Sequence, residues 1–117
     1  MADSPVSPAS APPAAAPQVV HHPEMRRFTA LVEGRESELA YRPPHAAADP
    51  GAEPRPVVDF VHTGVPRALE GRGIAAALVA AGLAWAREQG LAVRPVCSYV
   101  RVYMRRHPET ADLLPRA

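Results

Sequence analysis

Apolar and polar residues alternate in several short segments of the chain, and this alternation predicts β-strands. The clearest segment is Val57 to Thr63, which reads Val-Val-Asp-Phe-Val-His-Thr and is followed by Gly64. Strict alternation would place Val58, Phe60 and His62 on one face of this strand. Weaker strand patterns are found at residues 18–22, 26–32, 37–42 and 91–97, and Gly34 supplies a turn between the second and third of these.

The spacing of apolar residues changes to a helical period after Gly71. The pattern predicts a helix from Gly71 to Gln89 that stops at Gly90, a residue type that favours helix ends. Its large or central apolar positions follow helical spacing: Ile74, Leu78, Ala81 and Trp85. Small residues cover most of the remaining surface, so we expect this helix to be buried on several sides. A second, shorter helix is predicted over residues 99–106.

These elements predict one mixed α/β domain. The strand–helix–strand unit over residues 57–97 favours a right-handed crossover and a parallel strand pair, while the earlier strands form hairpins. Residues 1–17 are almost entirely Ala, Pro and Ser, so we expect a disordered tail there and a folded domain over residues 18–117. The segment Pro43 to Pro56 holds five prolines, and we interpret it as a tolerated hairpin extension in preference to a functional loop.

Bulk composition limits the function classes only broadly. The net charge is +1, which argues neither for nor against a polyanionic partner, and every one of the 13 basic residues is Arg. We expect neither a nucleic acid nor a membrane as a partner. The longest uncharged apolar run, Gly73 to Ala86, is too short to span a bilayer, and the N-terminus lacks the pattern of a secretory signal. The single cysteine, Cys97, cannot form an internal disulfide and fits a reducing compartment, which predicts a cytoplasmic protein.

The turn between the clearest strand and the long helix carries the strongest chemical signal. Gly71 and Gly73 leave the backbone free to approach a ligand, and the first turn of the helix offers unpaired N–H groups that suit a phosphate. Arg67 and Arg72 can add charge-assisted hydrogen bonds. A tight turn with close helix packing explains a lone Gly-x-Gly equally well. A Walker loop is excluded because no Gly-Lys-Ser/Thr is present, and the dinucleotide fingerprint lacks its third glycine.

The segment Glu70-Gly71-Arg72-Gly73-Ile74-Ala75 resembles the pyrophosphate loop of GCN5-related N-acetyltransferases (GNAT), whose pattern is Arg/Gln-x-x-Gly-x-Gly/Ala. Together with 62–66, 95–100, Tyr103 and 107–109, it resembles the small single-domain GNAT-like family from about Val19 to Leu114. The resemblance implies a minimal GNAT fold, with a mostly antiparallel sheet, one splayed parallel strand pair and two main helices.

The resemblance also implies acetyl-coenzyme A as cosubstrate, with the pantetheine arm between the splayed strands. Its implied binding residues are Val65, Arg67, Gly71, Arg72, Gly73, Ile74, Ala75 and Tyr99. Glu70 departs from the family pattern, because a carboxylate repels a pyrophosphate. Either Glu70 points to solvent and caps the helix, which we favour because Arg67 and Arg72 keep the loop positive, or affinity for the cosubstrate is reduced.

Three residues are candidates for catalysis by acetyl transfer. His62 has an ordinary pKa near ~6.5 and is the natural base for the acceptor amine. Cys97 resembles an active-site cysteine of the small family and could carry the acetyl group as a thioester, activated by His62. Tyr103, in preference to Tyr99, would protonate the leaving thiolate, while backbone amides near Val65 polarise the carbonyl. The structural alternatives are a buried small Cys97, a core His62 and two tyrosines that pack on the sheet.

Three functions remain open on the sequence alone. The first is an acetyl-CoA-dependent N-acetyltransferase that acts on an amine of a small molecule or a protein. The second is a non-catalytic module that binds acetyl-CoA or coenzyme A, which Glu70 keeps open. The third is a thiol switch at Cys97 with a purely structural loop. The histidines show no metal-ligand spacing, so no metal is expected, and the sequence predicts neither the acceptor nor the oligomeric state.

Overall fold

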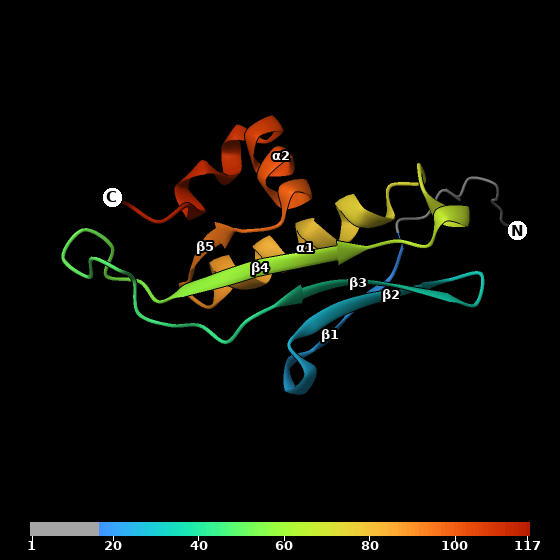
Figure 1. Ribbon diagram of the computed structural model, residues 1–117, viewed down its shortest axis with the longest axis horizontal. Coiled ribbons are helices and arrows are strands. Elements are labelled where there is room, and N and C mark those ends of the chain that lie inside the picture. The colour runs from blue at the N-terminus through green and yellow to red at the C-terminus, as the bar shows by residue number, and fades with distance from the viewer. Residues whose placement is uncertain (1–16) are drawn as a thin grey trace, which may run out of the picture.

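The computed structural model describes residues 17–117 and shows a single five-stranded sheet with two α-helices (Figure 1). The strands follow one another across the sheet in chain order, and their bounds are β1 Val19–His22, β2 Arg27–Val32, β3 Arg35–Tyr41, β4 Val57–Gly64 and β5 Ala92–Pro95. The helices are α1 Ile74–Glu88 and α2 Ser98–Arg106, and short 3-10 turns lie at Pro23–Met25, Arg67–Leu69 and Pro108–Leu113. The predicted tail falls almost wholly outside the described residues.

The sheet has the mixed pairing that the sequence predicts. The pairs β1–β2, β2–β3 and β3–β4 are antiparallel, while β4 and β5 are parallel and are joined through α1. The turn between β2 and β3 is tight because Glu33 and Gly34 both adopt positive φ angles, 51° and 74°. The α/β class, the parallel pair and the two main helices are therefore confirmed.

One face of the sheet carries the core. Residues that point to this face form one buried cluster with α1 and α2, and it includes Phe28, Leu39, Tyr41, Val58, Phe60 and Val93. Helix α1 approaches closely because position 82 is glycine, where a Cβ would lie 2.8 Å from the Leu39 side chain. Figure 1 shows α1 running along β4, with α2 beside it. The start of α1 is thereby fixed next to the end of β4.

A bulge in β4 changes which side chains share a face. Tyr41 of β3 lies opposite Phe60, but the adjacent Ala40 lies opposite His62, so Val61 has no partner on β3. Such an extra residue reverses the alternation beyond it. His62 therefore points to the face opposite Phe60, and the prediction that the two share a face is wrong.

The segment from Pro43 to Pro56 is tied down at several points. His45 bridges to Val57 through two backbone hydrogen bonds of 2.7 and 2.9 Å. The buried Glu53 carboxylate accepts hydrogen bonds from the Arg55 guanidinium at 2.8 Å and from the Arg116 backbone amide at 2.9 Å. These bonds join the segment to the C-terminal residues, which gives it a structural role in this fold.

Candidate active site

Strands β4 and β5 separate before β4 ends. They pair from Val57–Ala92 to Phe60–Pro95, and the Cys97 amide then donates a 2.9 Å hydrogen bond to the Phe60 carbonyl. Residues 61–64 of β4 run on without a partner on the β5 side, because the chain turns into α2. This divergence opens a gap beside the last turn of β4, at the carboxyl end where open α/β sheets bind ligands.

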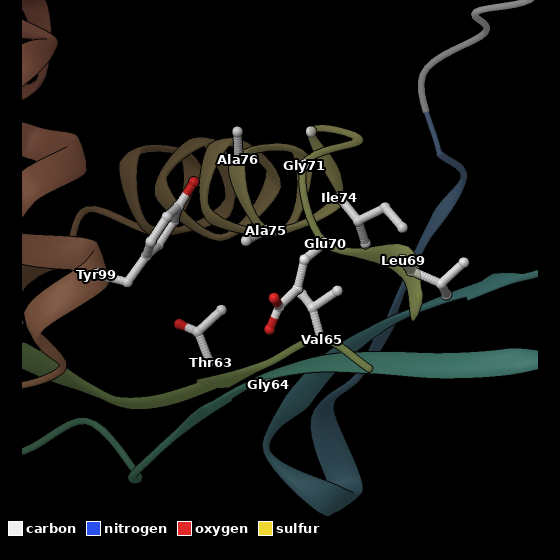
Figure 2. A pocket seen from close by; sticks show the side chains of 11 residues that line it. Thr63, Gly64, Val65, Leu69, Glu70, Gly71, Ile74, Ala75, Ala76 and Tyr99 are labelled. Carbon is white, nitrogen blue, oxygen red and sulfur yellow. The ribbon is translucent and has the colours of Figure 1, made fainter. Parts of the chain in front are cut away.

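A hollow of about 540 Å³ lies between the end of β4, the following loop and the first turns of α1 (Figure 2). Thr63, Gly64 and Val65 form one wall, and Tyr99 reaches in from α2. The other wall comes from the loop and helix residues Leu69, Glu70, Gly71, Gly73, Ile74, Ala75 and Ala76. Six of the eight residues expected to bind the cosubstrate thus line one hollow, namely Val65, Gly71, Gly73, Ile74, Ala75 and Tyr99.

Two glycines leave open space in the loop before α1. Gly71 and Gly73 adopt φ angles of 82° and 80°, and a Cβ at either position would meet nothing within 4 Å. Gly73 is the N-cap of α1, and its cap makes no side-chain hydrogen bond. The amides of the first turn have no partner within the helix itself, so they can bond to an anion, which the positive end of the helix dipole also favours.

The charges around this loop differ from the expected arrangement. Glu70 lines the hollow, and in Figure 2 its carboxylate is turned from the loop toward the end of β4. The N-cap of α1 is Gly73, so the prediction that Glu70 caps the helix is wrong. Arg72 forms an exposed ion pair with Glu33 in the β2–β3 turn, and neither Arg72 nor the exposed Arg67 lines the hollow.

Cys97 lies at the inner end of the strand gap, as the N-cap residue of α2. Its Sγ is 3.4 Å from Oγ1 of Thr63 on β4. Burial is the largest single influence on the thiol and opposes ionisation. The Thr63 hydroxyl and the backbone amides of Val100, Tyr99 and Thr63 outweigh it, and together they hold the pKa of Cys97 below its ordinary value. A thiol at a helix N-terminus with a lowered pKa suits nucleophilic chemistry.

The two tyrosines of α2 occupy different surroundings. Tyr99 is 40% exposed and borders the hollow, whereas Tyr103 lies one turn later in a separate hollow between α1 and the C-terminal turn. The Tyr103 ring stacks on His107 with centroids 3.9 Å apart. Burial, with Glu109 and Tyr99 adding to it, raises the pKa of Tyr103. The structure therefore brings Tyr99, and not Tyr103, to the hollow that holds the glycine loop.

His62 lies on the open face of the sheet. Its Nε2 atom is 3.7 Å from the Glu38 carboxylate of β3, and its side chain is 60% exposed. Gly64 leaves room for the ring, because a Cβ there would lie 3.0 Å from Nε2. Thr63, which contacts Cys97, lies opposite the core residue Leu39. His62 and Cys97 thus flank β4 from opposite sides, and the structure does not bring them together.

Comparison with known proteins decides the family. The chain matches the family described as "GCN5-related N-acetyl-transferase" over residues 27–113. The chain belongs to this family. It is 31% identical over 107 residues to "Protein NATD1" of Bos taurus, covering 87% of this chain and 88% of that protein. It is also 31% identical over 91 residues to "Protein NATD1" of Gallus gallus, covering 78% and 76%.

A solved GNAT-like structure shares the fold. It is a GCN5-like putative N-acetyltransferase from Staphylococcus aureus, with a TM-score of 0.60 and 20% identity over 88% of this chain and 92% of that chain.

Within residues 17–117, no cluster of three or more His, Cys, Asp or Glu side chains has the arrangement of a metal site. No helix of that part of the chain is long and apolar enough to cross a bilayer.

Sequence reasoning missed three residues that shape this candidate site. Thr63, which bonds to Cys97, carries no distinctive signal in the sequence, and it points toward the core only because of the bulge in β4. Glu38 belongs to a strand that only a weak sequence pattern marks, and its proximity to His62 depends on the β3–β4 register. Leu69 is a buried residue of the loop that also lines the hollow. The exposed tip of the loop carries a stronger sequence signal because glycines mark it.

Proposed function

We propose that this GNAT-family domain transfers an acetyl group from acetyl-coenzyme A to an amine. The observation that carries the proposal is the hollow at the start of α1, where Gly71 and Gly73 leave the uncapped first turn open beside the strand gap. A diphosphate would accept hydrogen bonds from the amides of Ile74 and Ala75. The pantetheine arm would then follow β4 past Val65 toward Thr63.

The side-chain charges around the hollow do not by themselves favour a diphosphate. Glu70 contributes a negative charge to the hollow, and Arg72 is held by Glu33 at the far side of the loop. The diphosphate would be bound mainly by backbone amides, with Arg67 available from the neighbouring turn. The backbone amides remain available as donors whichever side chain stands at position 70. The diphosphate could therefore still bind beside Glu70, with a lower affinity because of the negative charge.

The acetyl group would reach Cys97 at the inner end of the gap. In the covalent route, the thiolate Sγ attacks the thioester carbonyl carbon, the bond to coenzyme A sulfur breaks, and that sulfur leaves with the electron pair. Tyr99, which borders the hollow, replaces Tyr103 as the donor of a proton to the leaving sulfur. A base then takes the proton of the amine, the nitrogen attacks the acetyl carbon on Cys97, and the carbon–Sγ bond breaks with its electron pair returning to Sγ.

Direct transfer is the competing route. In this route, the amine attacks the acetyl-coenzyme A thioester itself, and Cys97 serves only as packing beside Thr63. Both routes use the same hollow and both require a base for the amine proton. They differ in whether a covalent acetyl-protein forms before an acceptor is added.

Mass spectrometry of the intact protein after incubation with acetyl-coenzyme A tests both routes. The covalent route predicts an acetyl adduct on Cys97 that a primary amine removes. The Cys97→Ala variant should then form no adduct and lose amine-dependent release of coenzyme A. Full transfer by Cys97→Ala would leave only the direct route. Absence of any thermal stabilisation by acetyl-coenzyme A or coenzyme A, up to millimolar concentration, would overturn the proposed function altogether.

A non-catalytic acetyl-CoA-binding module is the second candidate, and Glu70 is the observation that favours it. A carboxylate in the hollow lowers affinity for a diphosphate, as expected of a domain that releases its ligand easily. Stabilisation by acetyl-coenzyme A together with no release of coenzyme A across a panel of amines would support this candidate.

A further inference from the structure

A hollow of about 320 Å³ lies between the end of β5, α2 and the C-terminal turn, and we call it the β5-side hollow. Helix α2 and the 3-10 turn Pro108–Leu113 pack against each other here, next to β5 (Figure 1). This hollow shares no lining residue with the hollow at the start of α1 or with the one that holds Tyr103. Its lining is apolar apart from two arginines, and the apolar residues are Pro95, Met104, Pro108, Ala111 and Leu114.

Two guanidinium groups border the β5-side hollow without a carboxylate partner. Arg101 and Arg105 lie one turn apart on α2, and both side chains are exposed. The Arg101 Nη2 atom donates to the carbonyls of Pro95 and Val96 at 3.4 and 3.3 Å, so the guanidinium is positioned while its charge is not neutralised. Among the described residues neither arginine has an ion pair, whereas carboxylates pair with Arg27, Arg55, Arg72, Arg87 and Arg94.

The acidic residues of the C-terminal turn lie away from these two arginines. The Asp112 carboxylate pairs with Arg87 of α1 at 2.6 Å, and Glu109 borders the hollow that holds Tyr103. In the part of the chain that the structure describes, no acidic residue lines the β5-side hollow. The field there is therefore positive, and an anion with an apolar body would match both the arginines and the lining.

We infer that the β5-side hollow binds a small amphipathic carboxylate, of the class of medium-chain fatty acid anions. The alkyl chain lies against Met104 and Leu114, and the carboxylate oxygens accept hydrogen bonds from Arg101 and Arg105. Side chains four residues apart on a helix are neighbours, so the two guanidinium groups can reach one carboxylate. A mostly apolar hollow of this volume with a few polar groups at its border is typical of a small-molecule site.

A peptide strand added along β5 is a poorer occupant than a small acid. Pro95 ends β5 and has no backbone N–H, and its carbonyl already accepts a hydrogen bond from Arg101. This part of the sheet edge therefore cannot supply the backbone ladder on which strand addition depends. The apolar lining and the two guanidinium groups remain, and a fatty acid anion uses both.

Titration of the full chain with sodium octanoate, followed by amide chemical shifts, tests the inference. Octanoate is ionised at neutral pH and should shift the amides of Met104, Ala111 and Leu114. Acetate carries the charge without the chain, and 1-octanol carries the chain without the charge. Each should bind more weakly than octanoate by roughly fivefold or more, because each lacks one of the two contributions.

Variants of α2 test the role of the arginines. Arg105→Gln should weaken octanoate binding by roughly threefold or more, and the double variant Arg101→Gln/Arg105→Gln should weaken it further. The control Arg106→Gln removes an equal charge from the same end of α2, outside the lining of the hollow, and should leave octanoate binding nearly unchanged.

Four results would overturn the inference. They are equal affinity for octanoate and 1-octanol, undiminished affinity in the double variant, shifts confined to residues 71–76, and tighter binding of a blocked Asp-Leu-Leu-Asp peptide than of octanoate. The third would place the ion in the hollow at the start of α1, and the fourth would assign the surface to a protein partner. If the double variant does not fold, Arg105→Gln and the comparison with 1-octanol still decide. The inference does not depend on acetyl transfer, so failure of the acetyl-coenzyme A experiment leaves it standing.

Discussion

Gly82 sets the distance between α1 and the sheet, and its replacement tests how tightly the helix is packed. It lies buried in the middle of α1. A Cβ at this position would lie 2.8 Å from Cδ2 of Leu39 and 3.0 and 3.1 Å from two atoms of the Phe60 ring. Leu39 and Phe60 are both fully buried, so neither side chain can turn away into solvent.

Two opposing effects determine the result of Gly82→Ala. Alanine is favoured over glycine in a helix interior by about 1 kcal/mol. Forcing an extra methyl into a packed core costs about 1–3 kcal/mol, and contacts near 3 Å on two buried side chains place this site in the upper part of that range. We therefore expect a net loss of about 1 kcal/mol in the free energy of unfolding, which lowers Tm by about 4–8 °C for a domain of this size.

Thermal unfolding followed by circular dichroism measures this loss. The matched background is Leu39→Val, which shortens the side chain that makes the closest contact. In that background Gly82→Ala should cost less than in the wild-type chain, because the two sites share the crowded space. A higher Tm for Gly82→Ala, or an equal cost in both backgrounds, would refute the packing argument.

Three further predictions concern the site and the tied loop. Thr63→Val should slow alkylation of Cys97 by iodoacetamide at neutral pH by roughly threefold or more, because it removes a hydrogen bond to the thiolate, whereas Thr63→Ser should not. Glu70→Gln should tighten acetyl-coenzyme A binding by about fivefold at low salt, since two unit charges at ~4 Å interact by about 1 kcal/mol in water; calorimetry showing equal or weaker binding contradicts this. The Ala46 carbonyl and the Asp59 carboxylate raise the pKa of His45 above 6.5, so folding favours its protonated form. That stabilisation is present below pH 6.5 and is lost as the pH rises through the raised pKa of His45 in the folded protein. The difference in Tm between wild type and His45→Gln should therefore shrink from about pH 5.5 to about pH 8.5. A difference in Tm that stays constant over this range contradicts the argument.

The fold was largely predictable because its signals are local. Alternation marks β4, helical spacing marks α1, and the strand–helix–strand order favours a parallel pair. The bulge at Val61 was not predictable, because an extra residue in one strand leaves no trace in the strand's own sequence and depends on the partner strand. This single residue reversed the predicted face of His62 and turned Thr63 toward Cys97.

The site was predictable only where backbone conformation demands a residue type. Gly71 and Gly73 occupy positive φ angles, so the sequence marks the loop directly. Side-chain partners are a different matter, because they depend on registers and crossings that no local pattern records. Arg72 carries the charge expected at the loop but pairs with Glu33, and Tyr103 lies one helical turn beyond Tyr99, in a separate hollow.

The opposite placement of His62 and Cys97 divides the proposed chemistry between the two faces of β4. If Cys97 acts as a nucleophile, its thiolate depends on Thr63 and the start of α2, because His62 does not reach it. If His62 acts as a base, it serves the amine on the open face with Glu38 behind it. The two residues would then act in successive steps on different atoms. The covalent route would separate these steps, because Cys97 would accept the acetyl group in the first and His62 would take the amine proton in the second.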